Sequence, residues 1–546
     1  MTKHTRPLTR SLAIWTLSPV HVGCGEVYEP SGFVIHEGLL HVLDPADLAD
    51  SLSDDERKRL TATAKQPEPI GAIQRFFRDG AARFAELATQ QVAVAGDLAR
   101  EYATKAGRPT HRDPGGEPTY NLFPIARTAF RPFDGTPYLP GSSLKGSIRT
   151  AWLNHLNANS PLNPAERADR QGAARSLEQR LLGYAAGQFE NDPFRHLALA
   201  DAHPEDDSTP PPTRVLYAIS KKKRPPRDDE RPSPELKVFL ETIPEALPAS
   251  FLGEMRFGPS ATIPWEALCD ACNGFYRPQL EAELQHPVLG ALLDSEWARL
   301  IYRLLGEELD ELMAARQGFL LRVGRHSGAE SVTLGGLRNI KILGPRVDGK
   351  QTSDFRPATT EKRYASLTRS GNSGLLPFGW IWVDACDDRH RHLSDAVQQQ
   401  LASRSGLLRE AHQDRLLRLR EKQAQRAATA ATIVSEKQAR AVAARAEAEA
   451  EAKRQCELAL MNPDLRRIEE FKTDFAARAK QLRGKQENAN AVFHAKAKAL
   501  ARDAAAWPQA ERRAAADAIE HWLPQVVKVD IKDERRKLKL AALRAP

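Results

Sequence analysis

The order of apolar and polar residues changes character along the chain, and each change predicts a different kind of element. Residues 8–44 mix β-branched and aromatic residues, as in SLAIWTLSPVHVG, which predicts strands. The following GFVIHEGLLHVLD predicts a hairpin that turns at Glu37 and Gly38. In AIQRFFRDGAARFAELA, apolar residues such as Ile73, Phe77 and Phe84 recur near helical spacing, which predicts an inserted helical subdomain.

The last third of the chain differs from the rest in its amino-acid composition. No proline occurs between Pro377 and Pro463, and Ala, Arg, Glu, Gln and Leu dominate, which predicts long helices. We therefore expect an α+β core over residues 1–390 and a helical extension over 391–546. Within the core we expect helical insertions at about 45–107 and 262–313, and a flexible basic loop at about 203–234.

One stretch, PYLPGSSLKGSIRTAW, has the pattern of a strand end, a tight turn and a helix start. Gly141 supplies the turn, and Ser142 and Ser143 are expected to cap the helix. Free backbone N–H groups at a helix N-terminus suit a phosphate, and Lys145 and Arg149 place two cations on one face. The alternative is an ordinary capped helix with two solvated cations. The spacing of a Walker loop is absent, so nucleotide hydrolysis is not implied.

A second stretch, RQGFLLRVGRHSGAESVT, combines glycines with cations. Gly324 and Gly328 surround Arg325 and His326, and Arg322 precedes them. Glycines let a main chain approach a ribose-phosphate backbone while arginines pair with its oxygens. The spacing does not fit a dinucleotide-binding G-x-G-x-x-G motif.

Composition narrows the class of protein only modestly. The 546 residues carry a formal net charge of +8, which favours acidic partners without specifying them. No apolar run is long enough to span a membrane, the N-terminus does not resemble a signal peptide, and five cysteines fit a reducing cytoplasm. Cys269 and Cys272 form a C-x-x-C without a second ligand pair, so a buried helical pair is expected rather than a metal site. We expect no metal and no cofactor.

The PGSSLKGxxR pattern over Pro140–Arg149 resembles a signature of the RAMP proteins, the RNA-binding subunits of type III CRISPR effector complexes. LSPVHVGCGE, NDPFRHLALAD, GFLLRVGRHSGAESVT and LLPFGWIWV are similar to further RAMP segments, and they follow in the family's order over about residues 8–390. The DPFR segment and the glycine-rich run look most like the Csm-type subunit that closes the 3′ end of the crRNA. The resemblance implies a RAMP fold built on ferredoxin-like, RRM-like units.

The resemblance also implies a function and its partners. It predicts a non-catalytic, cytoplasmic RNA-binding subunit that holds the crRNA backbone and caps the filament of RAMP subunits. Its partners would be crRNA and the other RAMP backbone and small subunits, with target RNA as an open further partner and no membrane. The residues expected to contact RNA are Gly141, Ser142, Ser143, Lys145, Arg149, Arg322, Gly324, Arg325, His326, Ser327 and Gly328.

Two alternatives remain open at this point. Some RAMP proteins cleave repeat RNA through a histidine, and His21 and His326 are the candidates for such an endoribonuclease. The other alternative is a structural scaffold that works through its helical tail. Asp201 is expected to cap a turn or orient Arg195 rather than to cut RNA. The basic run SKKKRPPRDDERPSP, residues 220–234, suits RNA phosphates, although a solvated loop is its simpler interpretation.

Overall fold

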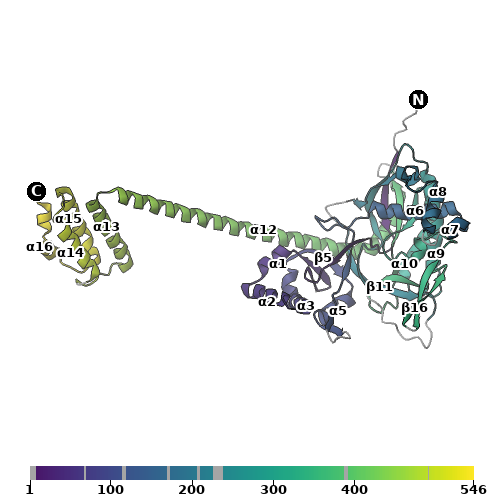
Figure 1. Ribbon diagram of the computed structural model, residues 1–546, viewed down its shortest axis with the longest axis horizontal. Helices are drawn as coiled ribbons and strands as arrows, with labels where there is room; N and C mark the ends of the chain where they lie inside the picture. Colours follow the sequence, from purple (N-terminus) through teal and green to yellow (C-terminus); the bar gives the residue numbers. More distant parts are fainter. Residues whose placement is uncertain are drawn as a thin grey trace, which may run out of the picture. The chain divides into compact units, whose positions relative to one another are not determined.

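The computed structural model describes residues 8–66, 69–112, 118–168, 172–205, 210–225, 238–347, 349–386, 391–489 and 491–545. The chain forms two compact units, Met1–Gln423 and Ala424–Pro546. The boundary falls inside one long helix, so the first turns of the helical extension belong to the first unit. Figure 1 labels the elements of both units.

One antiparallel sheet of the first unit is arranged around β1 (Leu8–Thr16). β1 pairs with β13 (Leu247–Phe257) on one side and with β19 (Trp380–Cys386) on the other. β14 (Gly318–Arg322) continues the sheet beyond β19, while β9 (Leu197–Leu199) and β10 (His203–Pro204) pair with β13. The fully buried aromatic residues Trp15, Trp380 and Trp382 anchor its core. Burial of these large apolar surfaces is the main source of the sheet's stability.

The second sheet is mixed, and its strands follow the order β2-β8-β12-β11-β5-β4-β3, with β17 beside β11 and β18 beside β17. The predicted hairpin is confirmed: β3 and β4 pair antiparallel, with Glu37 at φ 49° and Gly38 at φ 75° between them. Its strands are β2 (Gly23–Tyr28), β3 (Phe33–His36), β4 (Leu39–Leu43), β5 (Ala88–Val94), β8 (Ile125–Thr128), β11 (Arg214–Lys222), β12 (Val238–Thr242), β17 (Glu361–Ser366) and β18 (Leu376–Pro377).

Helices between these strands confirm the α+β class. Ser53 forms a capping box with Glu56 at the start of α2. The helices of the first unit that precede α12 are α1 (Pro45–Ser51), α2 (Asp54–Ala64), α3 (Ile70–Asp79), α4 (Ala81–Ala85), α5 (Gly96–Lys105), α6 (Gly141–Asn157), α7 (Pro164–Ala168), α8 (Ala173–Leu182), α9 (Trp265–Leu284), α10 (Ser295–Gly306) and α11 (Glu308–Ala314). Short 3-10 turns are η1 (Phe189–Asn191), η2 (Pro193–His196), η3 (Gly290–Leu292) and η4 (Ala329–Ser331).

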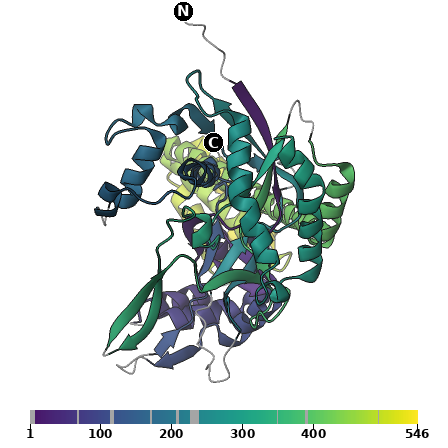
Figure 2. The same ribbon diagram turned by 90° about the vertical axis from the view of Figure 1, so that its right-hand side faces the viewer.

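Two small hairpins complete the first unit. β15 (Ile340–Val347) and β16 (Lys350–Arg356) pair with each other alone, and Figure 2 shows them extending away from the rest of the unit. β6 (Pro109–Arg112) and β7 (Pro118–Tyr120) form the other hairpin. The composition of residues 108–121 predicts a plain loop, and that prediction is wrong because the flanking residues pair across it.

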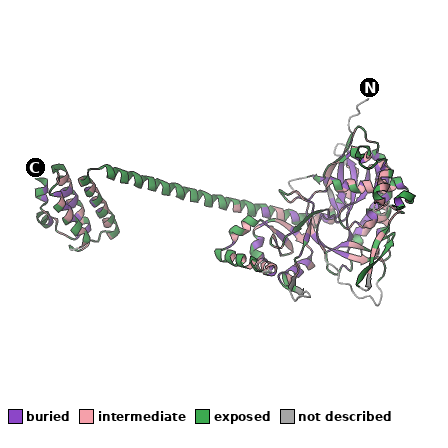
Figure 3. Cartoon of the chain, viewed as in Figure 1, coloured by how far each residue is buried: buried purple, intermediate pink, exposed green. Residues whose placement is uncertain are grey.

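The extension begins with α12 (Asp395–Leu460), and every residue of 427–457 is exposed (Figure 3). The second unit continues with α13 (Pro463–Leu482), α14 (Val492–Ala504), α15 (Gln509–Val526), α16 (Ile531–Lys537) and α17 (Leu540–Arg544). These helices enclose their own core, in which Phe475, Ile519, Leu523 and Val526 are fully buried. Among the described residues, no helix is both long and apolar enough to cross a membrane.

Candidate functional site

Helix α6 begins two or three residues earlier than its predicted caps, Ser142 and Ser143, would place it. The N-cap is Pro140, in an extended conformation, and it makes no capping hydrogen bond through its side chain. Ser142 is exposed and Ser143 is partly buried, and both lie inside the first turn. The predicted capping role of Ser142 and Ser143 is therefore wrong, because the fixed φ of proline already ends the extended segment at Pro140.

Gly141 packs against protein backbone. A Cβ atom here would lie 2.5 Å from the Leu199 carbonyl oxygen and 2.6 Å from that of Ala200. The Gly141 N–H donates to Asp201 Oδ1 at 2.8 Å. Asp201 thus satisfies a free N–H of α6 and lies where the helix dipole favours a carboxylate. Of its two predicted roles, this contact is a capping one, made at the start of α6.

Lys145 and Arg149 share one face of α6, but both are engaged within the protein. Lys145 Nζ donates to the Leu197 carbonyl oxygen at 2.7 Å, and burial lowers the pKa of this lysine. Arg149 Nε donates to Glu178 Oε1 at 2.8 Å, and its Nη2 donates to Asp192 Oδ2 at the same distance. A guanidinium held by two carboxylates is poorly available to a phosphate.

The glycine-rich loop after β14 lies directly on the N-terminal motif. Gly324 has φ +77°, and a Cβ on it would lie 2.2 Å from the His21 carbonyl oxygen. The same oxygen accepts a hydrogen bond from the Arg325 N–H at 2.8 Å. Gly379 of the LLPFGWIWV segment donates to the Pro19 carbonyl oxygen at 2.9 Å. Three motifs that lie far apart in the sequence therefore meet at one place.

Within this loop, Arg325 is the exposed member. His326 has φ +67°, and its pKa falls to about 3 because burial and the cations Arg363 and Arg325 disfavour its charged form. Ser327 is buried, and Gly328 has φ +87°. Arg363, on β17, was missed from the sequence because it lies in no recognisable motif and only the fold brings it beside His326.

Arg322 lies inside the core, where its side chain is 1% exposed. Its Nη1 lies 3.1 Å from Glu283 Oε2, its Nε donates to the Phe378 carbonyl oxygen at 2.9 Å, and its guanidinium lies over the Trp380 ring. The expectation that Arg322 contacts RNA is therefore corrected. The residue holds β14, α9 and β19 together.

The two candidate catalytic histidines lie close enough that His21 contributes to the lowered pKa of His326. His21 is fully buried, its Nδ1–H donates to the Glu241 carbonyl oxygen at 2.7 Å, and burial lowers its pKa. The Nε2 atoms of both rings are buried and without a hydrogen-bond partner. At neutral pH both rings are neutral, so they offer nitrogen lone pairs or N–H groups rather than charge.

The basic run at 220–234 is only partly described. Lys221 Nζ donates to the Ser370 carbonyl oxygen at 3.2 Å, and Lys223 pairs with Glu330 at 2.6 Å. Residues 226–234 lie outside the described residues, as do 206–209 of the predicted flexible loop.

Cys269 and Cys272 lie on α9 and are fully buried, as the helical-pair prediction requires. Desolvation raises the pKa of both thiols, which keeps them protonated. Among the described residues, no group of three His, Cys, Asp or Glu side chains is arranged to hold a metal ion.

Comparisons with known proteins find similarity to the same family that the sequence motifs resemble. Residues 14–272 match the family model described as the RAMP superfamily. The chain is 23% identical over 352 residues to "CRISPR system Cms protein Csm5" of Streptococcus thermophilus, covering 61% of this chain and 90% of that protein. It is 24% identical over 175 residues to the protein of the same name from Methanocaldococcus jannaschii, covering 29% of this chain and 33% of that protein.

Two solved structures are also similar. One is a chain of the "Cryo-EM structure of Csm-crRNA-target RNA ternary complex in type III-A CRISPR-Cas system", with 17% identity and a TM-score of 0.43 over 69% of this chain and all of that chain. The other is the "Crystal structure of T.onnurineus Csm5", with 16% identity and a TM-score of 0.38 over 68% of this chain and 99% of that one.

Proposed function

We propose that the chain is a RAMP protein and an RNA-binding, non-catalytic subunit of a type III CRISPR effector complex, as the match of residues 14–272 and the similarity to Csm5 support. In this proposal it holds the crRNA backbone near the 3′ end and caps the filament of RAMP subunits. Its partners are crRNA, the neighbouring backbone and small subunits, and target RNA when one is bound. Such a complex works in the cytoplasm.

The observation that carries the proposal is the position of Arg325. The hydrogen bond from the Arg325 N–H to the His21 carbonyl fixes the loop, at a place where Gly324 leaves no room for a side chain, while Arg325 itself stays exposed. A cation on a rigid loop loses little conformational entropy when it pairs with a phosphate. Such contacts recognise the backbone and not the bases, which suits a guide whose sequence varies.

The RNA contacts that remain in the proposal are Arg325, His326 and the edge of α6 with exposed Ser142 and the partly buried Ser143 and Lys145. Arg149 and Gly141 support this edge from inside the fold, through Asp192 and Asp201. Ser327, Gly324 and Gly328 shape the loop. The full burial of His21 favours binding over cleavage, because a general base must reach the 2′-hydroxyl that it deprotonates.

The experiment compares crRNA binding by the full-length chain and by its Arg325→Glu variant across a salt series. We expect the variant to bind about tenfold more weakly. The slope of log affinity against log salt should also fall by roughly 0.7, the value for one phosphate contact of a single strand.

Arg409→Glu is the matched control, because Arg409 is an exposed cation of the first unit that lies far along the sequence, on α12. It makes the same change in net charge, so it measures the general electrostatic effect. Equal affinities and slopes for the Arg325→Glu and Arg409→Glu variants would contradict the proposed contact.

A further inference from the structure

Arg415, on the part of α12 that belongs to the first unit, is a half-buried cation that meets no counter-charge among the residues that the structure describes. Its Nε and Nη2 atoms are both buried and have no hydrogen-bond partner. No carboxylate among the described residues pairs with it, and burial alone lowers its pKa. Arginine stays protonated in proteins, so within the described part of the chain this positive charge has no counter-charge.

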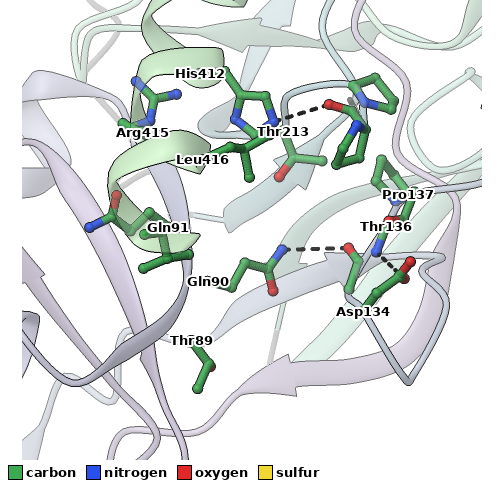
Figure 4. Close-up of a pocket in the computed structure, with 14 residues that line it drawn as sticks. Thr89, Gln90, Gln91, Asp134, Thr136, Pro137, Thr213, His412, Arg415 and Leu416 are labelled. Atoms are coloured by element: carbon green, nitrogen blue, oxygen red, sulfur yellow. Dashed lines mark hydrogen bonds between the residues drawn. The ribbon is translucent and has the colours of Figure 1, made fainter. Parts of the chain in front are cut away.

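Arg415 lines a pocket that α12 forms with three other segments (Figure 4). One wall is β5, which contributes Gln90 and Gln91, and a second wall is the turn 134–137. Gln90 Nε2 donates to the Gly135 carbonyl oxygen at 3.5 Å. The remaining lining residues are Thr89, Pro210, Pro211, Thr213, His412, Leu416 and Leu419.

No other group in this pocket balances the charge. Asp134 is its one carboxylate, and it is bound by Arg131 Nη2 at 2.6 Å and by the Thr136 N–H at 2.9 Å. His412 Nε2–H donates to the Pro210 carbonyl oxygen at 3.1 Å, and burial lowers the pKa of this histidine to about 4. His412 is therefore neutral near pH 7, and Arg415 is the pocket's one unpaired charge.

The two unsatisfied nitrogens define the ligand chemistry. Nε–H and Nη2–H form one edge of the guanidinium, and two parallel N–H donors on one edge match the two oxygens of a carboxylate. We propose that this pocket binds the carboxylate of an acidic side chain from a partner polypeptide. Proline and leucine side chains around Arg415 suit the aliphatic stem of such a residue. A nucleic-acid backbone is less suited, because its further phosphates would meet Asp134 and no second free cation.

The proposal predicts opposite effects of one substitution on stability and on binding. In the isolated full-length chain, Arg415→Met removes an unpaired charge from a half-buried site, so the melting temperature should rise by about 1–4 °C. N-acetyl-glutamate amide, added in the millimolar range, should raise the melting temperature of the wild-type chain. The same compound should leave the melting temperature of the Arg415→Met variant unchanged.

Arg415→Lys keeps the charge but removes the two-donor edge. Its melting temperature should therefore rise much less than that of the wild-type chain when N-acetyl-glutamate amide (the capped glutamate) is added. Arg418→Met, at an exposed position one turn along α12, is the matched control and should keep that response. A lower melting temperature for Arg415→Met, with no wild-type response to the capped glutamate, would overturn the proposal. A response to dimethyl phosphate that depends on Arg415, with none to the capped glutamate, would assign the pocket to a nucleic-acid phosphate instead.

An independent observation concerns where the charge of the chain lies. Residues 1–423 carry 54 Lys and Arg and 54 Asp and Glu, while residues 424–546 carry 25 and 17. The entire formal net charge of +8 therefore belongs to the second unit. The first unit, which contains the RAMP match, is neutral overall.

Part of this charge gathers at one end of the second unit. The Glu487 N–H donates to the Val526 carbonyl oxygen, and the Lys528 N–H donates to that of Glu487, both at 2.7 Å. These bonds bring the end of α13 beside the segment after α15. Exposed cations that no described ion pair holds gather there, and we call them the basic end: Lys480, Arg483, Lys485 and Lys528.

We infer that the basic end binds the phosphate backbone of a single-stranded nucleic acid, as a second contact outside the RAMP region. Several unpaired cations on one compact, separately packed unit suit sequence-independent phosphate binding. This inference does not rest on the proposed function, because the loop at Arg325 and the basic end lie on different units. Each contact can therefore fail without the other.

The test measures binding of the full-length chain to a 20-nucleotide oligouridine by fluorescence anisotropy over a salt series. Charge reversal of Arg483, Lys485 and Lys528 to Glu should weaken binding more than tenfold and lower the salt slope by about 2, from three phosphate contacts of a single strand. The control reverses three exposed cations of α12, Lys437, Arg440 and Lys453. Equal losses in the two triple variants, or no loss in either, would overturn the inference.

Discussion

Arg322 Nη1 lies 3.1 Å from Glu283 Oε2, and the two side chains are 1% and 0% exposed. Lys362 Nζ lies 3.4 Å from the other oxygen of Glu283, and Tyr364 and Trp380 donate hydrogen bonds to the carboxylate. The cations hold the pKa of Glu283 at about 2 despite its burial. A fully buried carboxylate therefore joins α9 to β14, β17 and β19, directly behind the glycine-rich loop.

Replacing this carboxylate should destabilise the first unit strongly. Glu283→Gln leaves Arg322 and Lys362 as uncompensated buried cations, so the free energy of unfolding should fall by roughly 3–5 kcal/mol. Urea denaturation measures this free energy of unfolding. The control is Glu281→Gln, at a partly exposed ion pair on the same helix, which should lower the free energy of unfolding by less than about 1 kcal/mol. Equal losses in the two variants would contradict the assigned role of Glu283.

Gly324 should be intolerant of any side chain. Gly324→Ala combines a positive φ with a Cβ 2.2 Å from a carbonyl oxygen. We therefore expect the free energy of unfolding to fall by about 2–4 kcal/mol and crRNA binding to weaken. Gly349→Ala has a similar φ of +74° but nothing within 4 Å of the added Cβ, so it should cost only about 1 kcal/mol. The difference between the two variants isolates the contact with His21, and equal losses would show that the contact contributes nothing.

Two glycines of α6 should respond in opposite directions to the same substitution. Gly141→Ala places a Cβ against two carbonyl oxygens and should lower the free energy of unfolding by about 1–3 kcal/mol. Gly146→Ala meets nothing within 4 Å inside the helix and should raise it by up to about 1 kcal/mol. If both variants are stabilised, the close packing of Gly141 on residues 199 and 200 is not present in solution.

Stability should fall in mild acid because of His412. Its pKa is about 4 in the folded chain against 6.5 for an ordinary histidine, so the unfolded chain binds the proton more tightly. The folded state therefore loses stability as the pH falls from about 6.5 towards 4, by about 2 kcal/mol at pH 5. His412→Gln keeps a donor for the Pro210 carbonyl and should flatten this part of the pH profile. An unchanged profile would show that His412 is not buried as a neutral ring.

Local features of the fold were predictable because their causes lie within a few residues. The hairpin at Glu37 and Gly38 follows from a two-residue turn between alternating strands, and the helical position of Cys269 and Cys272 follows from local periodicity. Serine caps at 142 or 143 would start α6 two or three residues too late, because a proline, and not a serine, occupies the N-cap.

The partners of the charged residues were not predictable from the sequence. A pattern can show that Arg149 and Arg322 are cations, but Glu178, Asp192 and Glu283 become their partners only in the folded chain. Likewise Asp201 lies 60 positions from Gly141, and no spacing rule connects them. That Arg325 contacts RNA stays a prediction from the glycine-rich pattern and the resemblance, while its exposure on the loop comes from the structure.

The most direct test of the proposed function is to purify the complex from cells that carry the chain's own CRISPR locus, crosslink it and sequence the RNA bound to this chain. We expect enriched guide RNAs whose crosslinks concentrate near the 3′ end, recovered together with other RAMP subunits. Crosslinks at the 5′ repeat-derived tag would contradict the capping position, and the absence of enriched RNA would contradict RNA binding altogether.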